Sequence, residues 1–147
     1  MKIALGRIEL PLLPHQPGRN PRPPDDLFQP LFAELALLES IDELAQSAAY
    51  AAGFEAFFAG YFWEAHELWE PVWMALPPAS RERHLLQGLI QLANAGLKRR
   101  MRQDGAAVKI LARADAAIAE AFRESAITVM GVDSAYSANL RKQVIVL

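Results

Sequence analysis

Residues 58–73 read FAGYFWEAHELWEPVW, and they hold three tryptophans, one histidine and three glutamates within about four helical turns. At about 100° per residue, most of the large apolar side chains fall on one broad face. This pattern predicts a helix over residues 61–75 that packs against a core. Pro77 and Pro78 should end the helix, and Pro71 should kink it or mark an irregular turn.

Helix signals continue on both sides of this segment. Ser40 and Glu43 form an S-x-x-E capping box, and Gly60 can provide a left-handed helix exit. Asp104-Gly105 predicts a turn. No strand pattern occurs between residues 30 and 142. The predicted helices, besides the one already named, cover residues 30–39, 41–59, 80–101, 106–124 and 133–142.

The helices predict an all-α fold, a compact bundle of about five to six antiparallel helices. Residues 1–29 differ from the remainder because six prolines favour extended geometry between residues 11 and 24. We therefore expect an extended Pro-rich arm, within which residues 1–10 could form a short strand. Residues 30–147 are expected to form a single helical domain.

Composition excludes several classes of protein. The chain has 147 residues, a net charge of −2 and no cysteine, so disulfides and thiolate chemistry are ruled out. No apolar run approaches the roughly 18 residues that a membrane span requires. Gly6, Arg7 and Glu9 interrupt the apolar N-terminus, which argues against a signal peptide. We expect a cytoplasmic protein that does not bind membranes.

A histidine–glutamate pair lies at the edge of the apolar face. His66 and Glu70 are four residues apart and meet on one side of a helix. Glu64 and Glu67 are expected further round, toward solvent. The following helix carries a polar stripe, and pairing of the two helices would bring this stripe against His66 and Glu70 in a semi-buried seam. The stripe consists of Gln87, Gln91, Asn94 and Lys98.

Two motifs stand out, EAHELWEPVW over residues 64–73 and QGLIQLA over residues 87–93. Together they resemble the domain of unknown function 309 family, a group of small prokaryotic helical proteins. A Gly-Ala pair at residues 105–106 and the GVD at residues 131–133 extend the similarity, which covers about residues 50–142. The resemblance implies a compact helical bundle, and it carries no established activity. The Pro-rich arm lies outside it.

The sharper functional hypothesis is a metal-dependent or acid–base enzyme that uses His66, Glu67 and Glu70. Imidazole and carboxylate groups suit divalent ions, and His84 or Gln87 could add a third ligand. The plainer interpretation is a structural hydrogen bond between His66 and Glu70. The H-E-x-x-E pattern lacks the second histidine of a zincin, and no nucleophilic serine motif or phosphate loop is present. We therefore name no reaction, and a divalent metal stays the only cofactor considered.

The leading functional hypothesis is a structural or interaction module that self-associates. Trp69 and Trp73 are expected in the core, whereas Trp63 points away from them and could join Met74 in a partner or oligomer surface. No small-molecule ligand can be named. The candidate binding residues are Trp63, Trp69, Trp73, Gln87, Gln91 and Asn94.

Cationic residues gather near the end of the fourth predicted helix and on the next one. Such a cluster could follow the phosphates of nucleic acid. Cations at a helix C-terminus also complement the helix dipole, and the net negative charge favours this simpler interpretation. Nucleic acid is therefore not expected as a partner. The residues concerned are Lys98, Arg99, Arg100, Arg102, Lys109 and Arg113.

Overall fold

Helices dominate the computed structural model, which describes residues 4–5 and 8–147 and confirms the all-α class. Gly6 and Arg7 lie outside the described residues. The helices are α1 (Gln29–Leu35), α2 (Ile41–Ala45), α3 (Ala48–Phe58), α4 (Phe62–Ala75), α5 (Arg81–Arg100), α6 (Asp104–Ala121) and α7 (Ser134–Ile145). The remaining elements are β1 (Ala4–Leu5), β2 (Ile8–Glu9), a 3₁₀ turn (Arg123–Ser125), β3 (Thr128–Val129) and β4 (Val132–Asp133).

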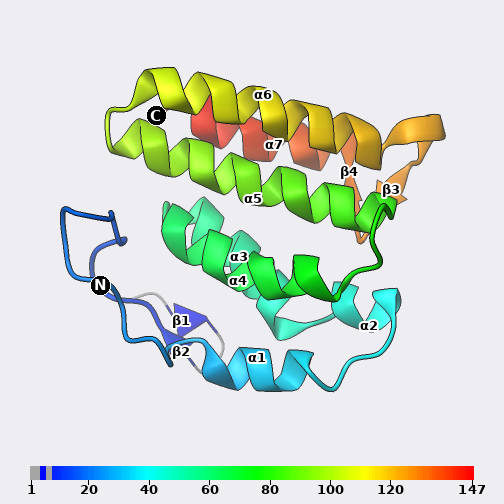
Figure 1. Ribbon diagram of the computed structural model, residues 1–147, viewed down its shortest axis with the longest axis horizontal. Coiled ribbons are helices and arrows are strands. Elements are labelled where there is room, and N and C mark those ends of the chain that lie inside the picture. Colours follow the sequence, from blue (N-terminus) through cyan, green and yellow to red (C-terminus); the bar gives the residue numbers. More distant parts are fainter. Residues whose placement is uncertain (1–3, 6–7) are drawn as a thin grey trace.

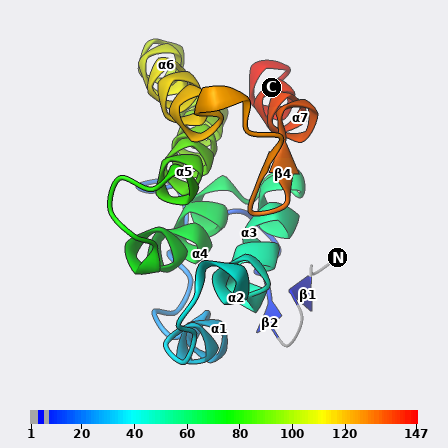
Figure 2. The ribbon, with the colours of Figure 1, turned by 90° about the vertical axis from the view of Figure 1, so that its right-hand side faces the viewer.

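The helices stack in layers (Figures 1 and 2). α6 and α7 lie on one side, α5 lies beneath them, and α3 and α4 follow. α1 and the β1–β2 pair cover the far side of α3 and α4. Short connections join α3 to α4, α4 to α5 and α5 to α6, so consecutive helices run antiparallel, as the sequence predicts. Among the described residues, no helix has the length and apolarity needed to cross a bilayer.

Several predicted helix boundaries are confirmed by their capping contacts. The Ser80 and Asp133 side chains accept from backbone N–H groups three residues on and begin α5 and α7. Ser40 does the same at α2. Gly60 has a φ of 84° and provides the predicted left-handed exit between α3 and α4. α4 continues through Pro71 as one helix and ends before Pro77.

Three local predictions are wrong. The helix expected over residues 41–59 is two helices, because Ser47 caps a new start by accepting from the Tyr50 N–H. Asp104-Gly105 is not the turn before α6 but part of its first turn, since Arg102 adopts the left-handed conformation instead. Strands do occur after residue 30. β3 and β4 form an antiparallel pair over residues 128–133, closed by Gly131 at a φ of 77°.

A tryptophan occupies the centre of the core. Trp69 is fully buried, and its indole N–H donates to the main-chain oxygen of Tyr50 at 3.1 Å. Phe54 and Phe57 lie against the indole, with ring centroids 5.1 and 5.9 Å away. Gly53 allows this approach, because a Cβ there would lie 2.0 Å from the indole nitrogen. The core placement predicted for Trp69 is therefore confirmed.

The Pro-rich arm packs on the helices of its own chain. Ile8, Leu10 and His15 are buried. The hydroxyl of Tyr61 donates to the main-chain oxygen of Pro11, which fastens the arm to the start of α4. β2 also pairs with β1 in register Ala4 to Glu9, so the strand expected within residues 1–10 is a small hairpin in its described part.

Candidate functional site

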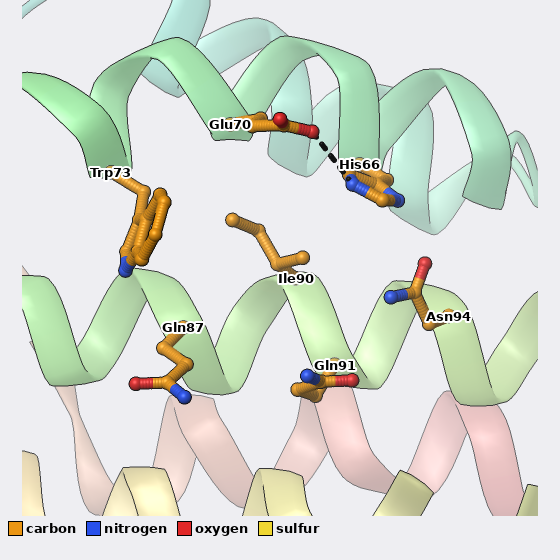
Figure 3. A pocket seen from close by; sticks show the side chains of 7 residues that line it. All are labelled: His66, Glu70, Trp73, Gln87, Ile90, Gln91 and Asn94. Atoms are coloured by element: carbon orange, nitrogen blue, oxygen red, sulfur yellow. Dashed lines mark hydrogen bonds and ion pairs between the residues drawn. The ribbon is translucent and has the colours of Figure 1, made fainter.

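A groove of about 350 Å³ separates α4 from α5 (Figure 3). α4 presents every fourth or third residue to it, and α5 does the same from the facing side. Because the helices are antiparallel, Trp73 lies opposite Gln87 at one end and His66 opposite Asn94 at the other. The complete lining is His66, Glu70, Trp73, Gln87, Ile90, Gln91 and Asn94.

The His66–Glu70 pair forms the α4 side of the groove. The His66 Nε2 and Glu70 Oε2 atoms are 2.9 Å apart, and the side chains are 27% and 48% exposed. A surface pair of this kind contributes little to stability, on the order of 0.5 kcal/mol. Glu67 lies beside the pair, and one potential ligand atom from each of the three residues falls within 4.8 Å of the others.

The α5 side of the groove offers amide groups. The side chains of Gln87, Gln91 and Asn94 have no hydrogen-bond partner among the residues that the structure describes. Trp73 closes one end, where the guanidinium of Arg83 lies 4.3 Å from its ring centroid. The Trp73 indole nitrogen is buried and also lacks an acceptor. Such unpaired groups provide several donors for a ligand or partner.

Other predicted site residues lie elsewhere. Trp63 packs edge-on against His15 of the arm at 4.7 Å between ring centroids, with Arg22 also near its ring, so it faces its own chain. Trp69 lies in the core. His84 does not line the groove; it lies close enough to Glu120 on α6 to help lower the pKa of that carboxyl, after the larger effect of Arg123.

Glu64 does not lie where the sequence predicted it. It was expected toward solvent, but it is fully buried on α4, outside the lining of the groove. Its Oε2 accepts from the backbone N–H of His15 at 3.0 Å, whereas its Oε1 has no partner among the described residues. Burial raises the pKa of this carboxyl, and the bond from His15 opposes that rise. The His15 ring in turn contacts Asn20, with its Nδ1 atom 3.1 Å from the Asn20 Oδ1 atom.

A sequence signal for Glu64 did exist. On a helical wheel Glu64 lies about 40° from Leu68 and about 60° from Tyr61, both of which belong to the apolar face. The wheel gives no information on which element covers this side of α4. The arm covers it, and the backbone N–H of His15 donates the hydrogen bond that a buried carboxylate requires.

The groove offers two kinds of chemistry. The imidazole of His66 and the carboxylate of Glu70, together with Glu67 beside the groove, could hold a divalent cation with open coordination positions. Alternatively, the free amides could bind polar groups of a partner. None of the seven lining residues carries a hydroxyl, thiol or amine, so within the described chain the groove offers no nucleophile for covalent catalysis beyond the imidazole and carboxylate.

Comparison with known proteins yields one match. No curated protein and no solved structure matches the chain. Residues 50–110 match the family described as Domain of unknown function (DUF309). These residues contain α4, α5 and the whole of the α4–α5 groove, together with both motifs that carry the resemblance. The segment that builds the groove is therefore similar to the DUF309 family, as the resemblance implies.

Proposed function

We propose that this protein is a self-associating interaction module and that the α4–α5 groove receives a second copy of the chain. The observation that carries the proposal is the set of unpaired polar groups in the groove. The amides of Gln87, Gln91 and Asn94 line the groove and have no hydrogen-bond partner among the described residues. A second copy that supplies matching donors and acceptors would add hydrogen bonds that the single chain lacks.

The groove has the composition of a protein interface. Trp73 and Ile90 give it an apolar floor, and the amides with the His66–Glu70 pair give it a polar rim. Met74, beside Trp73 on α4, is 64% exposed and could extend the apolar contact. Trp63 no longer belongs to this surface, because the arm covers it.

The oligomeric state tests this proposal directly. Sedimentation equilibrium at protein concentrations up to about 100 µM should detect a dimer of moderate affinity. Gln91→Arg places a bulky charge in the groove and should give a monomer. The matched variant Gln46→Arg lies on an exposed helix end outside the groove and should leave association unchanged. A monomeric wild-type protein, or a dimer that Gln91→Arg does not weaken, would refute self-association through the groove.

A divalent-cation site is the second candidate function. It is favoured by one geometric observation, that ligand atoms of His66, Glu67 and Glu70 converge within 4.8 Å. With three protein ligands, such an ion would keep positions for water and could support metal-assisted hydrolysis. The residues come from one helical turn and a half, so no change of fold is needed for them to bind.

Metal analysis of the purified protein separates the two candidates. The cation site predicts a bound metal at about one equivalent. His66→Ala should remove that metal, and Glu55→Ala, at an exposed position of α3, should retain it. If the protein contains no metal, binds no added Zn²⁺ or Mn²⁺, and His66→Ala changes only its melting temperature, the cation site is excluded.

A further inference from the structure

The turn between α5 and α6 borders a second cavity, of about 510 Å³, at the far end of α5 from Gln87. Its volume lies within the range of small-molecule sites. Three of its five lining residues are arginines, and one is a carboxylate, so the local charge is positive. The lining is Arg99, Arg100, Arg102, Asp104 and Leu147.

No acidic side chain of the described residues pairs with these arginines, Arg99, Arg100 and Arg102. One nitrogen of Arg99 donates to the main-chain oxygen of Leu147 at 2.6 Å, but its Nε is buried and unpaired. Arg100 lies over the Phe62 ring, 5.8 Å from its centroid. An exposed cluster of cations usually pairs with neighbouring carboxylates, and this one does not.

Capping of α5 does not explain the cluster. The main-chain oxygens of residues 97–99 accept from the backbone N–H groups of residues 101–103. The main-chain oxygen of Met101 accepts from Arg19 of the arm. These bonds satisfy the main-chain oxygens of residues 97–99 and of Met101 without any guanidinium group of the cluster. Among the described residues, the guanidinium groups of Arg100 and Arg102 are therefore free for another acceptor.

The start of α6 adds positive potential to the same place. Gln103 precedes the helix and makes no side-chain cap, so first-turn N–H groups stay available. Gly105 is exposed, and a Cβ there would meet nothing within 4 Å, so a ligand can approach the backbone. Asp104 is the opposing feature, because its carboxylate in the cavity repels an anion.

We propose that this cavity binds the phosphate groups of a small phosphorylated metabolite. Guanidinium groups match phosphate oxygens in bidentate geometry, and they stay charged at all physiological pH values. The space beyond the arginines accommodates an organic group as well as the phosphates. This site shares no residue with the α4–α5 groove, so it stands independently of the self-association proposed above.

Titration calorimetry with inorganic pyrophosphate tests the proposal. At low salt we expect a dissociation constant below about 1 mM for the wild-type protein. Arg102→Gln should weaken binding by about tenfold, since Arg102 is exposed and its replacement should leave the fold intact. Asp104→Asn should tighten binding several-fold because it removes the repelling charge. Arg113→Gln, an exposed arginine of α6 outside the cavity, is the matched control.

Compared with the wild-type protein, Asp104→Asn should bind pyrophosphate more tightly, Arg113→Gln equally well and Arg102→Gln more weakly. Circular dichroism melts of each variant confirm that the helices are intact. Absence of binding to the wild-type protein at about 10 mM pyrophosphate would overturn the proposal. So would equal weakening by Arg113→Gln and Arg102→Gln, because that result indicates attraction to overall charge and not to the cavity. Repeating the titration with ribose 5-phosphate tests whether an organic phosphate binds more tightly than pyrophosphate.

Discussion

Gly53→Ala should destabilise the protein, although alanine is the better helix former. Gly53 lies within α3 and faces the fully buried Trp69. An alanine Cβ would lie 2.0 Å from the indole nitrogen and 2.4 Å from two of its ring carbons. These distances are far below van der Waals contact, and the indole is enclosed by Phe54 and Phe57, so it cannot move aside freely.

The magnitude follows from three effects. Overpacking a well-packed core costs about 1–3 kcal/mol. Displacing the indole also breaks its hydrogen bond to Tyr50, which is worth about 1 kcal/mol. The higher helix propensity of alanine returns about 1 kcal/mol. The second and third effects cancel, so we expect the free energy of unfolding to fall by about 1–3 kcal/mol, a large fraction of the stability of a domain of this size.

Urea unfolding followed by circular dichroism measures this change. Gly105→Ala is the matched control, since that glycine lies in the exposed first turn of α6 with open space at its Cβ position, and it should be neutral or slightly stabilising. Trp69→Phe removes the nitrogen that meets the new Cβ. The double variant should therefore be more stable than the sum of the single effects predicts, by about 1 kcal/mol. If Gly53→Ala unfolds with the wild-type free energy, the packing described around Trp69 is wrong.

Three further predictions concern the arm and a helix cap. Because burial raises the pKa of Glu64 above its ordinary value of 4.5, the wild-type protein should lose stability as pH rises from about 4.5 through that raised pKa. Urea unfolding at several pH values measures this change, and Glu64→Gln should not show it. If the free energies of unfolding of wild type and variant differ by the same amount at every pH, the raised pKa of Glu64 is contradicted. Tyr61→Phe removes the hydroxyl that binds Pro11, so limited proteolysis should cut the arm faster while the helical bundle melts nearly as before; unchanged cleavage would count against this anchor. Asp133→Ala should lower the free energy of unfolding by about 1 kcal/mol through loss of the α7 cap, whereas Asp133→Asn should have little effect.

Local signals in the sequence predicted the helices well because the groups that start and stop them are neighbours in the chain. Ser80 and Asp133 cap the helices that follow them, and Gly60 ends α3. The errors arose where two local options compete. Ser47 is a good N-cap residue, but it lacks the Glu or Gln three positions on that completes the capping box at Ser40, so the break between α2 and α3 was not predicted. Arg102 adopts the left-handed conformation that was expected near Gly105, and its side chain gives no signal for that conformation.

The meeting of His66 and Glu70 with the amides of the next helix followed from helix periodicity and the pairing of consecutive helices. His66 and Glu70 are four residues apart on α4, and Gln87, Gln91 and Asn94 recur at spacings of four and three on α5. Once short connections make the helices antiparallel neighbours, the two stripes must meet. Two details differ from the prediction, because Trp73, expected in the core, is only partly buried and lines the groove, whereas Lys98 of the stripe does not line it. Periodicity gives no information on whether a histidine–glutamate pair binds a partner, a metal ion or only itself, since all three uses need the same spacing.

Glu64 shows the kind of information that helical periodicity cannot contain. Its burial depends on residues 8–28, about fifty positions earlier in the chain, which lie outside every helix signal. A charged residue can occupy this position because the His15 N–H reaches it and the arm excludes water. The arm is thus part of the folded unit. Helix α4 carries polar residues on two sides, with Glu64 buried beneath the arm and His66 and Glu70 in the open groove. A perturbation that releases the arm would therefore expose Glu64 and Trp63 together, because His15 contacts both.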